Sequence, residues 1–304
     1  MNRNLLQNQS IVITGAAGGI GSAVAHYLAQ LGAKLVIADH DGAAVESLAD
    51  VLRTQGCATT ACATDVTSWS ACGELVERCV AEHGGINGLV NLAGIMYLAR
   101  PWEETSGERA RRLLEVNLLG TYQMGVHALT HMQRQGHGAI VNVSSGTQAG
   151  MASGGAYAAS KGGVASLTYA WAMDGAAHGI RVNAISPVAT TAMSQVTDAY
   201  LRQQGMLADN RPTVDPMCNA PTVAFLLSPL SSRLNGQVFR VHDKQLQLMS
   251  HPAVSLPVME DDAWDAERIA EAVEHHFGEA LPPLGVHGVE ARYAPLANAL
   301  QVPR

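Results

Sequence analysis

A tyrosine and a lysine four residues apart, Tyr157 and Lys161, are the residues whose types and spacing best suit catalysis. If their segment is helical, residues at i and i+4 share one face. An ammonium beside a phenol stabilises the phenolate, and so lowers the phenol pKa from its ordinary value of about 10. We therefore expect Tyr157 to act as a general acid or base with Lys161 as its partner. The alternative is an exposed tyrosine and lysine on an alanine-rich helix, because the pair alone is a weak motif.

A glycine-rich segment, Thr14–Gly21, lies between a short β-branched run and a segment with helical periodicity. Glycines at 15, 19 and 21 permit a tight turn and close backbone approach, and a helix N-terminus offers free N–H groups to a pyrophosphate. Asp39 ends the next apolar run, where a carboxylate can accept hydrogen bonds from ribose hydroxyls. It would repel a 2′-phosphate, and neither neighbour is Arg or Lys, which favours NAD over NADP. The alternative is that Asp39 only caps the following helix.

The elements that must position these residues alternate between strands and helices. Apolar runs predict strands at 10–13, 34–38, 58–63, 88–91, 138–143, 180–185 and 237–241, and helical patterns lie at 20–31, 42–55, 67–82, 106–135, 155–177 and 221–227. Continuous apolar strands that alternate with helices are typical of a parallel sheet covered on both faces. The predicted fold is α/β, a single doubly wound Rossmann domain over residues 1–250 with a mainly parallel seven-stranded sheet. Its ligand site should lie at the carboxyl ends of the strands.

The region 251–304 differs in composition, being richer in Pro, His and acidic residues. One amphipathic helix is predicted at 262–277, with an apolar stripe. The stripe consists of Ala266, Ile269, Ala270, Val273 and Phe277. We interpret the region as a C-terminal helical extension that packs on the core or on a neighbouring subunit.

Composition argues against several classes of protein. The net charge is −7 and the pI is about 5.9, so no electrostatic footprint for nucleic acid or an anionic membrane is present. The five cysteines form no CxxC pair, which indicates reduced thiols and a cytoplasmic protein. No apolar run approaches the ~18 residues of a membrane span, and the first ten residues are too polar for a signal peptide. His127 and His131 have i, i+4 spacing without a third ligand, so no metal is expected.

Further motifs follow in order along the chain. They are Asp65-Val66, Asn91-Leu92-Ala93-Gly94, Asn117, Val141-Asn142-Val143-Ser144-Ser145 and Asn183-Ala184-Ile185-Ser186-Pro187. With the TGxxxGxG spacing of residues 14–21, they make the chain resemble a classical short-chain dehydrogenase/reductase over roughly residues 5–245. The catalytic residues implied by the resemblance are Asn117, Ser145, Tyr157 and Lys161. The cofactor-binding residues implied are Gly15, Gly19, Ile20, Gly21, Asp39, Asp65, Val66, Asn91, Ala93, Gly94, Tyr157, Lys161, Pro187 and Thr191.

The resemblance implies a role for each catalytic residue. Tyr157 would exchange the proton, Lys161 would hold the nicotinamide ribose, and Asn117 would anchor a water linking Lys161 to solvent. Ser145 would hydrogen-bond the reacting oxygen, with Ser144 as the alternative because the serine-to-tyrosine segment is one residue shorter than usual. Thr191 is placed by the simplest alignment, since Val188 stands where the family has glycine after Pro187.

The implied activity is NAD-dependent interconversion of a secondary alcohol and a ketone by a homo-oligomer, a tetramer or a dimer. The substrate would be a largely hydrophobic small molecule, such as a hydroxyacyl compound or a hydroxysteroid, because the expected substrate segments are soft and apolar. Those segments contain Met96, Tyr97, Met151, Met193, Tyr200, Leu201, Met206 and Leu207. The alternatives are a non-catalytic NAD-binding sensor or scaffold, and an isomerase or dehydratase with tightly held NAD.

Overall fold

The computed structural model describes residues 4–205, 212–254, 258–277 and 284–286, and it divides the chain into two units, Met1–Met249 and Ser250–Arg304. Within the described part of the first unit, eight strands form one sheet in the order β3-β2-β1-β4-β5-β6-β7-β8. The strands are β1 Ser10–Thr14, β2 Lys34–Asp39, β3 Thr59–Ala63, β4 Gly88–Asn91, β5 Gly138–Val143, β6 Ile180–Pro187, β7 Val238–His242 and β8 Gln245–Leu248.

The first seven strands pair in parallel, as the apolar runs predicted. The eighth, β8, was not predicted and lies antiparallel to β7 at the sheet edge. A two-residue turn connects these strands, and its first residue, Asp243, has a φ of 52°. All four side chains of β8 are exposed, so the strand lacks the buried apolar run that marks the others.

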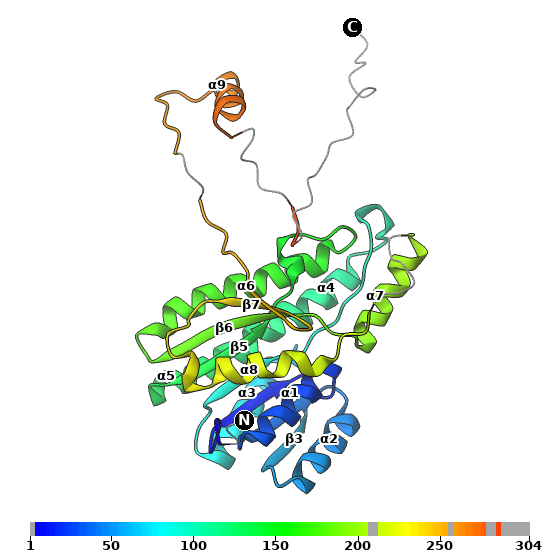
Figure 1. The fold of residues 1–304 in the computed structure, drawn as a ribbon, viewed down its shortest axis with the longest axis vertical. Helices are drawn as coiled ribbons and strands as arrows, with labels where there is room; N and C mark the ends of the chain where they lie inside the picture. The colour runs from blue at the N-terminus through cyan, green and yellow to red at the C-terminus, as the bar shows by residue number, and fades with distance from the viewer. Residues whose placement is uncertain (1–3, 206–211, 255–257, 278–283, 287–304) are drawn as a thin grey trace. The chain divides into compact units, whose positions relative to one another are not determined.

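Helices cover both faces of the sheet (Figure 1). They are α1 Gly19–Gln30, α2 Gly42–Thr54, α3 Trp69–His83, α4 Glu108–Leu114, α5 Gly120–Gln135, α6 Gly155–Ala176, α7 Ala192–Gln203 and α8 Ala220–Leu227. Alternate strand side chains point to opposite faces. Ile11 and Ile13 belong to a buried cluster with side chains of α1, α2 and α8, and Val12 belongs to a second cluster with side chains of α3, α5 and α6. The doubly wound α/β fold is therefore confirmed.

The long helix predicted at 106–135 is interrupted. A π-helical turn, Glu115–Leu119, joins α4 to α5. Such turns are frequent at functional sites, and this one contains the buried residue Asn117.

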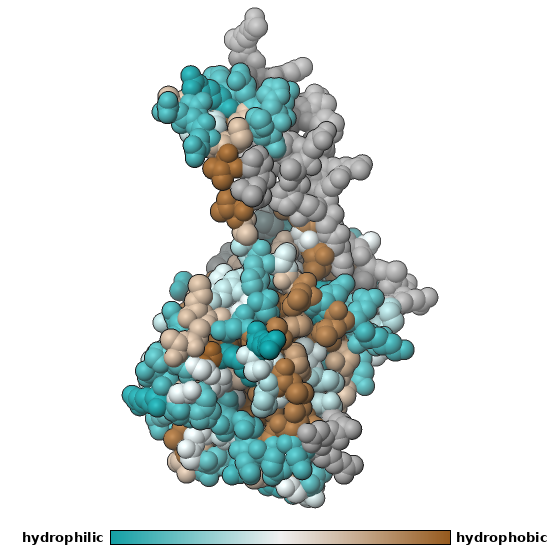
Figure 2. All heavy atoms as spheres, turned by 60° about the vertical axis from the view of Figure 1, so that its left-hand side comes forward, coloured by the Kyte–Doolittle hydropathy of each residue, from teal (hydrophilic) through white to brown (hydrophobic). Residues whose placement is uncertain are grey.

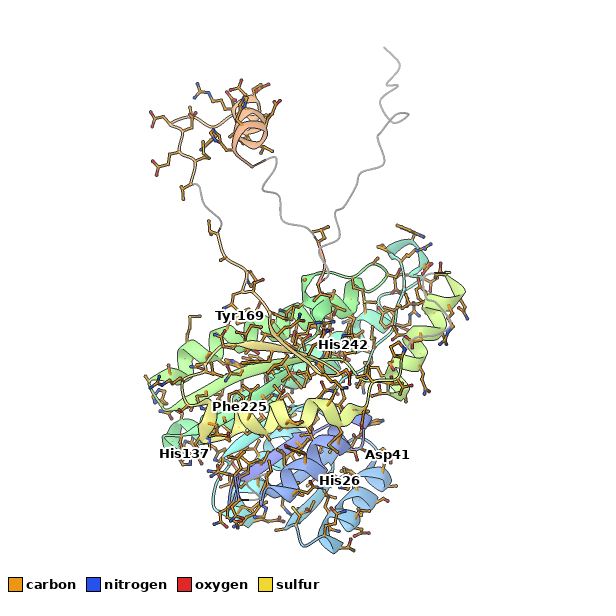
Figure 3. All side chains as sticks on the ribbon, viewed as in Figure 1. His26, Asp41, His137, Tyr169, Phe225 and His242 are labelled. Atoms are coloured by element: carbon orange, nitrogen blue, oxygen red, sulfur yellow. The ribbon has the colours of Figure 1, made fainter. Side chains whose placement is uncertain are left out.

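The ends of the strands show where the site must form. Figure 3 labels Asp41, just after β2, and His242, the last residue of β7, at the end of the sheet opposite to His137, which precedes β5. The carboxyl ends of the parallel strands therefore share one edge, where a doubly wound sheet binds its ligand.

The second unit contains α9, Ala266–Ala272, followed by a π-helical turn, Val273–Phe277. Asp265 caps α9 by accepting a hydrogen bond of 2.8 Å from the Arg268 N–H. The helix begins four residues later than predicted, because the Asp265 cap fixes its start. Packing of this extension on the core or on a neighbouring subunit stays a prediction. Among the helices that the structure describes, none combines the length and the apolar character that crossing a membrane requires.

Candidate active site

At Gly15 and Gly21 the glycine-rich turn is packed too closely for a side chain. Gly15 has a φ of 66°, and a Cβ there would lie 2.6 Å from the Ala93 nitrogen. A Cβ on Gly21 would lie 2.1 Å from the Gly15 carbonyl oxygen. At Gly19 a Cβ would lie 2.9 Å from Thr191 Cγ2, so the turn sits beside the segment that follows β6. This bare backbone at the start of α1 suits close approach by a pyrophosphate.

Asp39 ends β2 next to this turn. Its Oδ2 accepts a hydrogen bond of 3.0 Å from the Ala17 N–H, and its Oδ1 accepts one of 3.2 Å from the Asp41 N–H. His40 Nδ1 lies 2.8 Å from the same Oδ1. The residue that caps α2 is Asp41, which accepts from the Ala44 N–H at 3.0 Å. The capping alternative for Asp39 is therefore wrong, and its carboxylate faces the glycine-rich turn.

Asp65 and Val66 follow β3. Asp65 accepts hydrogen bonds from the Thr67 N–H at 2.9 Å and the Thr67 hydroxyl at 2.8 Å, and Arg112 Nη2 lies 3.7 Å away. The Thr67 N–H is the main cause that lowers the pKa of Asp65, with the Arg112 charge acting in the same direction. Val66 is buried, and its carbonyl accepts from Gln123 Nε2 at 3.1 Å. The adenine contact expected of the pair stays a prediction.

Ser145 and Tyr157 meet at the carboxyl edge. Tyr157 lies in the first turn of α6, and its hydroxyl hydrogen-bonds the Ser145 side chain. Ser144 is 1% exposed, and its Oγ lies 2.6 Å from Gln148 Oε1 and 2.9 Å from the Lys161 carbonyl oxygen. The Ser144 hydroxyl is thus used in contacts with Gln148 and the Lys161 carbonyl, and Ser145 is the serine beside the phenol.

The pKa of Tyr157 is shifted in the direction opposite to the one expected. Burial raises it to about 12, and the Ser145 hydrogen bond only partly opposes this. Lys161 lies on the same face of α6, but its Nζ donates to the Val143 carbonyl at 2.7 Å and is 5.7 Å from the centre of the Tyr157 ring. Burial also lowers the pKa of Lys161 to about 8. The ammonium is therefore engaged by β5 rather than by the phenol.

Asn117 fixes the segment after β4 against these residues. Its Oδ1 accepts from the Ile95 N–H at 2.7 Å, and its Nδ2 donates to the Ile95 carbonyl at 2.9 Å. A Cβ on Gly94 would lie 3.3 Å from Asn117 Oδ1 and 3.8 Å from Lys161 Nζ. The structure thus brings Asn117, Gly94 and Lys161 together. The water that Asn117 was expected to anchor stays a prediction.

A row of polar side chains crosses the sheet beneath the site. Asn91 Nδ2 donates to Asn142 Oδ1 at 2.9 Å, and Asn142 Nδ2 donates to Thr168 Oγ1 at 3.0 Å. The Asn91 Oδ1 atom is buried and has no hydrogen-bond partner among the residues that the structure describes. The Asn91 amide N–H joins β4 to β5 and, through Asn142, to α6. The cofactor contact expected of Asn91 stays a prediction.

Several of the expected substrate residues lie in the segment after β6, and the structure shows that this segment contains a helix, α7. Pro187 ends β6, and Thr191 caps α7 with a reciprocal hydrogen-bond pair to Ser194, at 2.9 and 3.3 Å. Thr191 followed by Ser194 was the sequence signal for this helix start. The predicted substrate residues Met206 and Leu207 lie outside the described residues.

The two histidines at metal-compatible spacing contact protein groups. His127 Nε2 lies 3.1 Å from the Trp69 carbonyl oxygen, and His131 Nε2 lies 3.0 Å from Glu77 Oε1. Both contacts join α5 to α3, which agrees with a packing role for these side chains.

Comparison with known proteins identifies the family. The family model of the short chain dehydrogenases matches residues 9–201, well over half of the chain. The chain belongs to the short-chain dehydrogenase family. It is 40% identical over 236 residues to cis-4-hydroxycyclohexanecarboxylate dehydrogenase from Sinomonas cyclohexanicum, covering 76% of this chain and 93% of that protein. As a member of this family, the protein is an oxidoreductase that acts on alcohols or ketones.

Solved structures support the same assignment. A short chain dehydrogenase from Mycobacterium avium is 27% identical with a TM-score of 0.81, covering 95% of this chain and 100% of that one. An NAD⁺-bound xylitol dehydrogenase is 28% identical with a TM-score of 0.71, covering 77% of this chain and 98% of that one.

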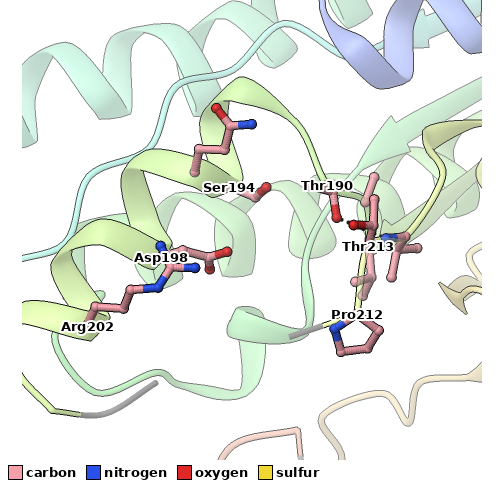
Figure 4. Close-up of a pocket in the computed structure, with 10 residues that line it drawn as sticks. Thr190, Ser194, Asp198, Arg202, Pro212 and Thr213 are labelled. Atoms are coloured by element: carbon pink, nitrogen blue, oxygen red, sulfur yellow. Dashed lines mark hydrogen bonds between the residues drawn. The ribbon is translucent and has the colours of Figure 1, made fainter. Parts of the chain in front are cut away.

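This short-chain dehydrogenase also has a cavity of about 200 Å³ beside α7 (Figure 4). It lies between one face of α7 and the segments 188–190 and 212–214. Ser194, Asp198 and Arg202 line it from the helix, and Thr190 and Thr213 line it from the opposite wall. Ser145 and Tyr157 do not belong to its lining.

Proposed function

We propose that this short-chain dehydrogenase interconverts a secondary alcohol and a ketone with NAD(H), using Tyr157 as its acid and base. The observation that carries the proposal is the contact between the Tyr157 and Ser145 hydroxyls, with Lys161 on the same helix face. A phenol with a raised pKa stays protonated at neutral pH and can donate to a carbonyl oxygen. The family assignment and the bare glycine turn both support this chemistry.

Each side chain has a distinct task in the proposed reaction. During reduction, Tyr157 gives its proton to the substrate oxygen, and Ser145 steadies that oxygen by a hydrogen bond. During oxidation, the alcohol proton passes to Tyr157, which must first be a phenolate. The Lys161 ammonium donates to the Val143 carbonyl and lies 5.7 Å from the centre of the Tyr157 ring, so its charge would stabilise the phenolate only across that distance. When bound, the nicotinamide accepts or gives the hydride.

The choice of NAD rests on Asp39. The glycine turn would hold the pyrophosphate, and the Asp39 carboxylate would accept hydrogen bonds from the adenosine ribose. A carboxylate that faces the turn would repel a 2′-phosphate. Lys161 would hold the nicotinamide ribose, and Thr191, packed beside Gly19, would meet the nicotinamide end. The NAD⁺-bound xylitol dehydrogenase is a relative that carries this cofactor.

We infer a cyclic secondary alcohol as the substrate class. The relative from Sinomonas cyclohexanicum is named for a hydroxyl group on a six-membered carbon ring, and it matches over 93% of its length. Met96 and Met193, on the loop after β4 and on α7, provide soft apolar surface of the kind that suits a ring.

We also propose that the protein forms a homo-oligomer, because large apolar side chains are exposed on two of its helices. Large apolar side chains are exposed on α5 and α6, among them Tyr122 at 43% and Met173 at 74%. Figure 2 shows apolar side chains in brown on the face that it presents. Exposed apolar surface of this kind is typical of a protein–protein contact.

The test is a substrate screen paired with one variant. We expect oxidation of cis-4-hydroxycyclohexanecarboxylate or another cyclic secondary alcohol, followed through the absorbance of the reduced nicotinamide, with NAD preferred over NADP. The Tyr157→Phe variant should lose at least about 100-fold in turnover, because proton transfer is lost. It should still bind NADH, measured by fluorescence. Tyr122→Phe on α5 is the matched control and should keep full turnover. Near-normal turnover by Tyr157→Phe, or a preference for NADP, would contradict the proposal.

A further inference from the structure

Helix α7 begins beside the glycine-rich turn, and it has little packing of its own. All twelve of its residues are described, and none of them is buried. Its first turn is fixed by the Thr191–Ser194 capping pair, with Thr191 against Gly19. The rest of the helix therefore depends on individual polar contacts for its position.

One such contact is a short hydrogen bond near the end of the helix. The Tyr200 hydroxyl donates to Glu103 Oε2 at 2.7 Å. One turn earlier, Thr197 Oγ1 lies 3.4 Å from Met96 Sδ. Both partners belong to the loop that follows β4, so this face of α7 rests on that loop.

Glu103 is prepared to accept the bond. It ends a short 3-10 turn, Pro101–Glu103, and the Arg100 N–H donates to the same Oε2 at 2.9 Å. That backbone hydrogen bond and the one from Tyr200 hold the pKa of Glu103 below its usual range. The carboxylate is therefore ionised at neutral pH, and hydrogen bonds to ionised acceptors are the stronger kind.

The loop that carries Glu103 is itself tied to the site. Ile95 is held by the Asn117 amide group. Ala99 forms a bridge with Gly154, and its N–H donates to the Ser153 carbonyl at 2.7 Å, just before the helix that bears Tyr157. The loop is thus held at Ile95 and at Ala99, whereas α7 has no buried residue to fix it.

We propose that the Tyr200–Glu103 hydrogen bond is a latch that holds α7 closed over the substrate. Tyr200 and Glu103 are positioning residues, since they act through the helix. The inference rests on the proposed function. Because Thr191, at the other end of α7, packs against the glycine turn, the latch also links enclosure of the substrate to the cofactor end of the site.

Opening the latch should weaken substrate binding and leave the chemical step intact. We expect Tyr200→Phe to raise the substrate KM about 10-fold, the size of one charge-assisted hydrogen bond. The rate of hydride transfer at saturating substrate, measured in a single turnover, should be unchanged. Glu103→Gln keeps an oxygen for the Arg100 N–H and should give a smaller rise. The double variant should be no worse than Tyr200→Phe, because the two residues form one interaction.

Hydrogen exchange gives a readout that needs no substrate. In the full chain without ligand, amides of α7 should exchange faster in Tyr200→Phe than in the wild type, while amides of α6 are unchanged. Tyr122→Phe, which removes a hydroxyl far from α7 in the sequence, is the control for both measurements.

The outcomes separate the latch from the proposed function. Unchanged exchange in α7, or additive effects of the two substitutions on KM, would overturn the latch while leaving the oxidoreductase intact. Faster exchange with an unchanged KM would refute the positioning role alone. A wild-type protein that oxidises no alcohol would refute the proposed function and the positioning role together, and the exchange data would still decide whether the bond holds α7.

Discussion

Replacing Lys161 should change how the stability of the protein depends on pH. The side chain is 5% exposed, and burial lowers its pKa from 10.5 to about 8. In the folded protein the ammonium therefore releases its proton near pH 8, whereas in the unfolded chain it does so near 10.5. Between these values the unfolded chain binds more protons, so the free energy of unfolding rises with pH.

The expected magnitude follows from the two pKa values. One pKa unit corresponds to about 1.4 kcal/mol, so the full effect is about 3 kcal/mol, most of it between about pH 7 and pH 10. Lys161→Met keeps the length of the side chain and removes the titration. The free energy of unfolding of the wild type, minus that of Lys161→Met, should therefore rise with pH over this range.

The assay is urea unfolding without cofactor at several pH values up to about 10. Tyr157 sets the upper limit, because its pKa is raised to about 12, and stability from its bound proton is lost only as the pH rises from about 10. Lys244→Met, which removes an exposed lysine, is the matched control variant. A flat or falling difference for Lys161→Met would refute the argument that burial disfavours its charge.

Two further predictions concern neighbouring positions. Ser145→Ala should reduce turnover at least about 100-fold with little loss of stability. Ser144→Ala should lower the free energy of unfolding in urea by about 1–2 kcal/mol, because it breaks contacts with Gln148 and the backbone. The reverse pattern would make Ser144 the catalytic serine. Gly125→Ala should destabilise the protein by about 1–3 kcal/mol, since the new Cβ would lie 2.3 Å from Trp171 Cη2. Unfolding at unchanged urea concentration would mean that the indole ring moves aside without cost.

The sequence alone predicted those elements of the structure that depend on a single local rule. Buried parallel strands are continuous apolar runs, so six of the seven parallel strands could be located from their sequence pattern, whereas β3, Thr59–Ala63, is mostly half-buried and its pattern is weak. The glycine turn could be predicted because backbone crowding at Gly15 and Gly21 leaves room for no other residue. The order of motifs then gave the family.

Other features depend on contacts that no local pattern records. The strand β8 has only exposed side chains, so nothing in its composition marks it as part of the sheet. The π-helical turn at Asn117 shifts the hydrogen bonds of a helix without changing its apolar stripe. The Lys161 ammonium donates to a carbonyl oxygen of β5, eighteen residues earlier. Burial of the Tyr157 phenol, another tertiary effect, raises its pKa where the local spacing predicted a lowered one.

The polar row of Asn91, Asn142 and Thr168 also bears on how the sheet assembles. Apart from these amides, β4 and β5 consist of Gly, Ala, Val, Leu and Ile, which could slide past one another with little loss of apolar contact. Asn91, however, pairs directly with Asn142 in the register observed. A slip of one residue would turn the Asn142 amide to the opposite face, and a slip of two would separate it from its Asn91 partner. These side chains therefore specify the register of β4 against β5, because misaligned pairings lose their hydrogen bonds during folding.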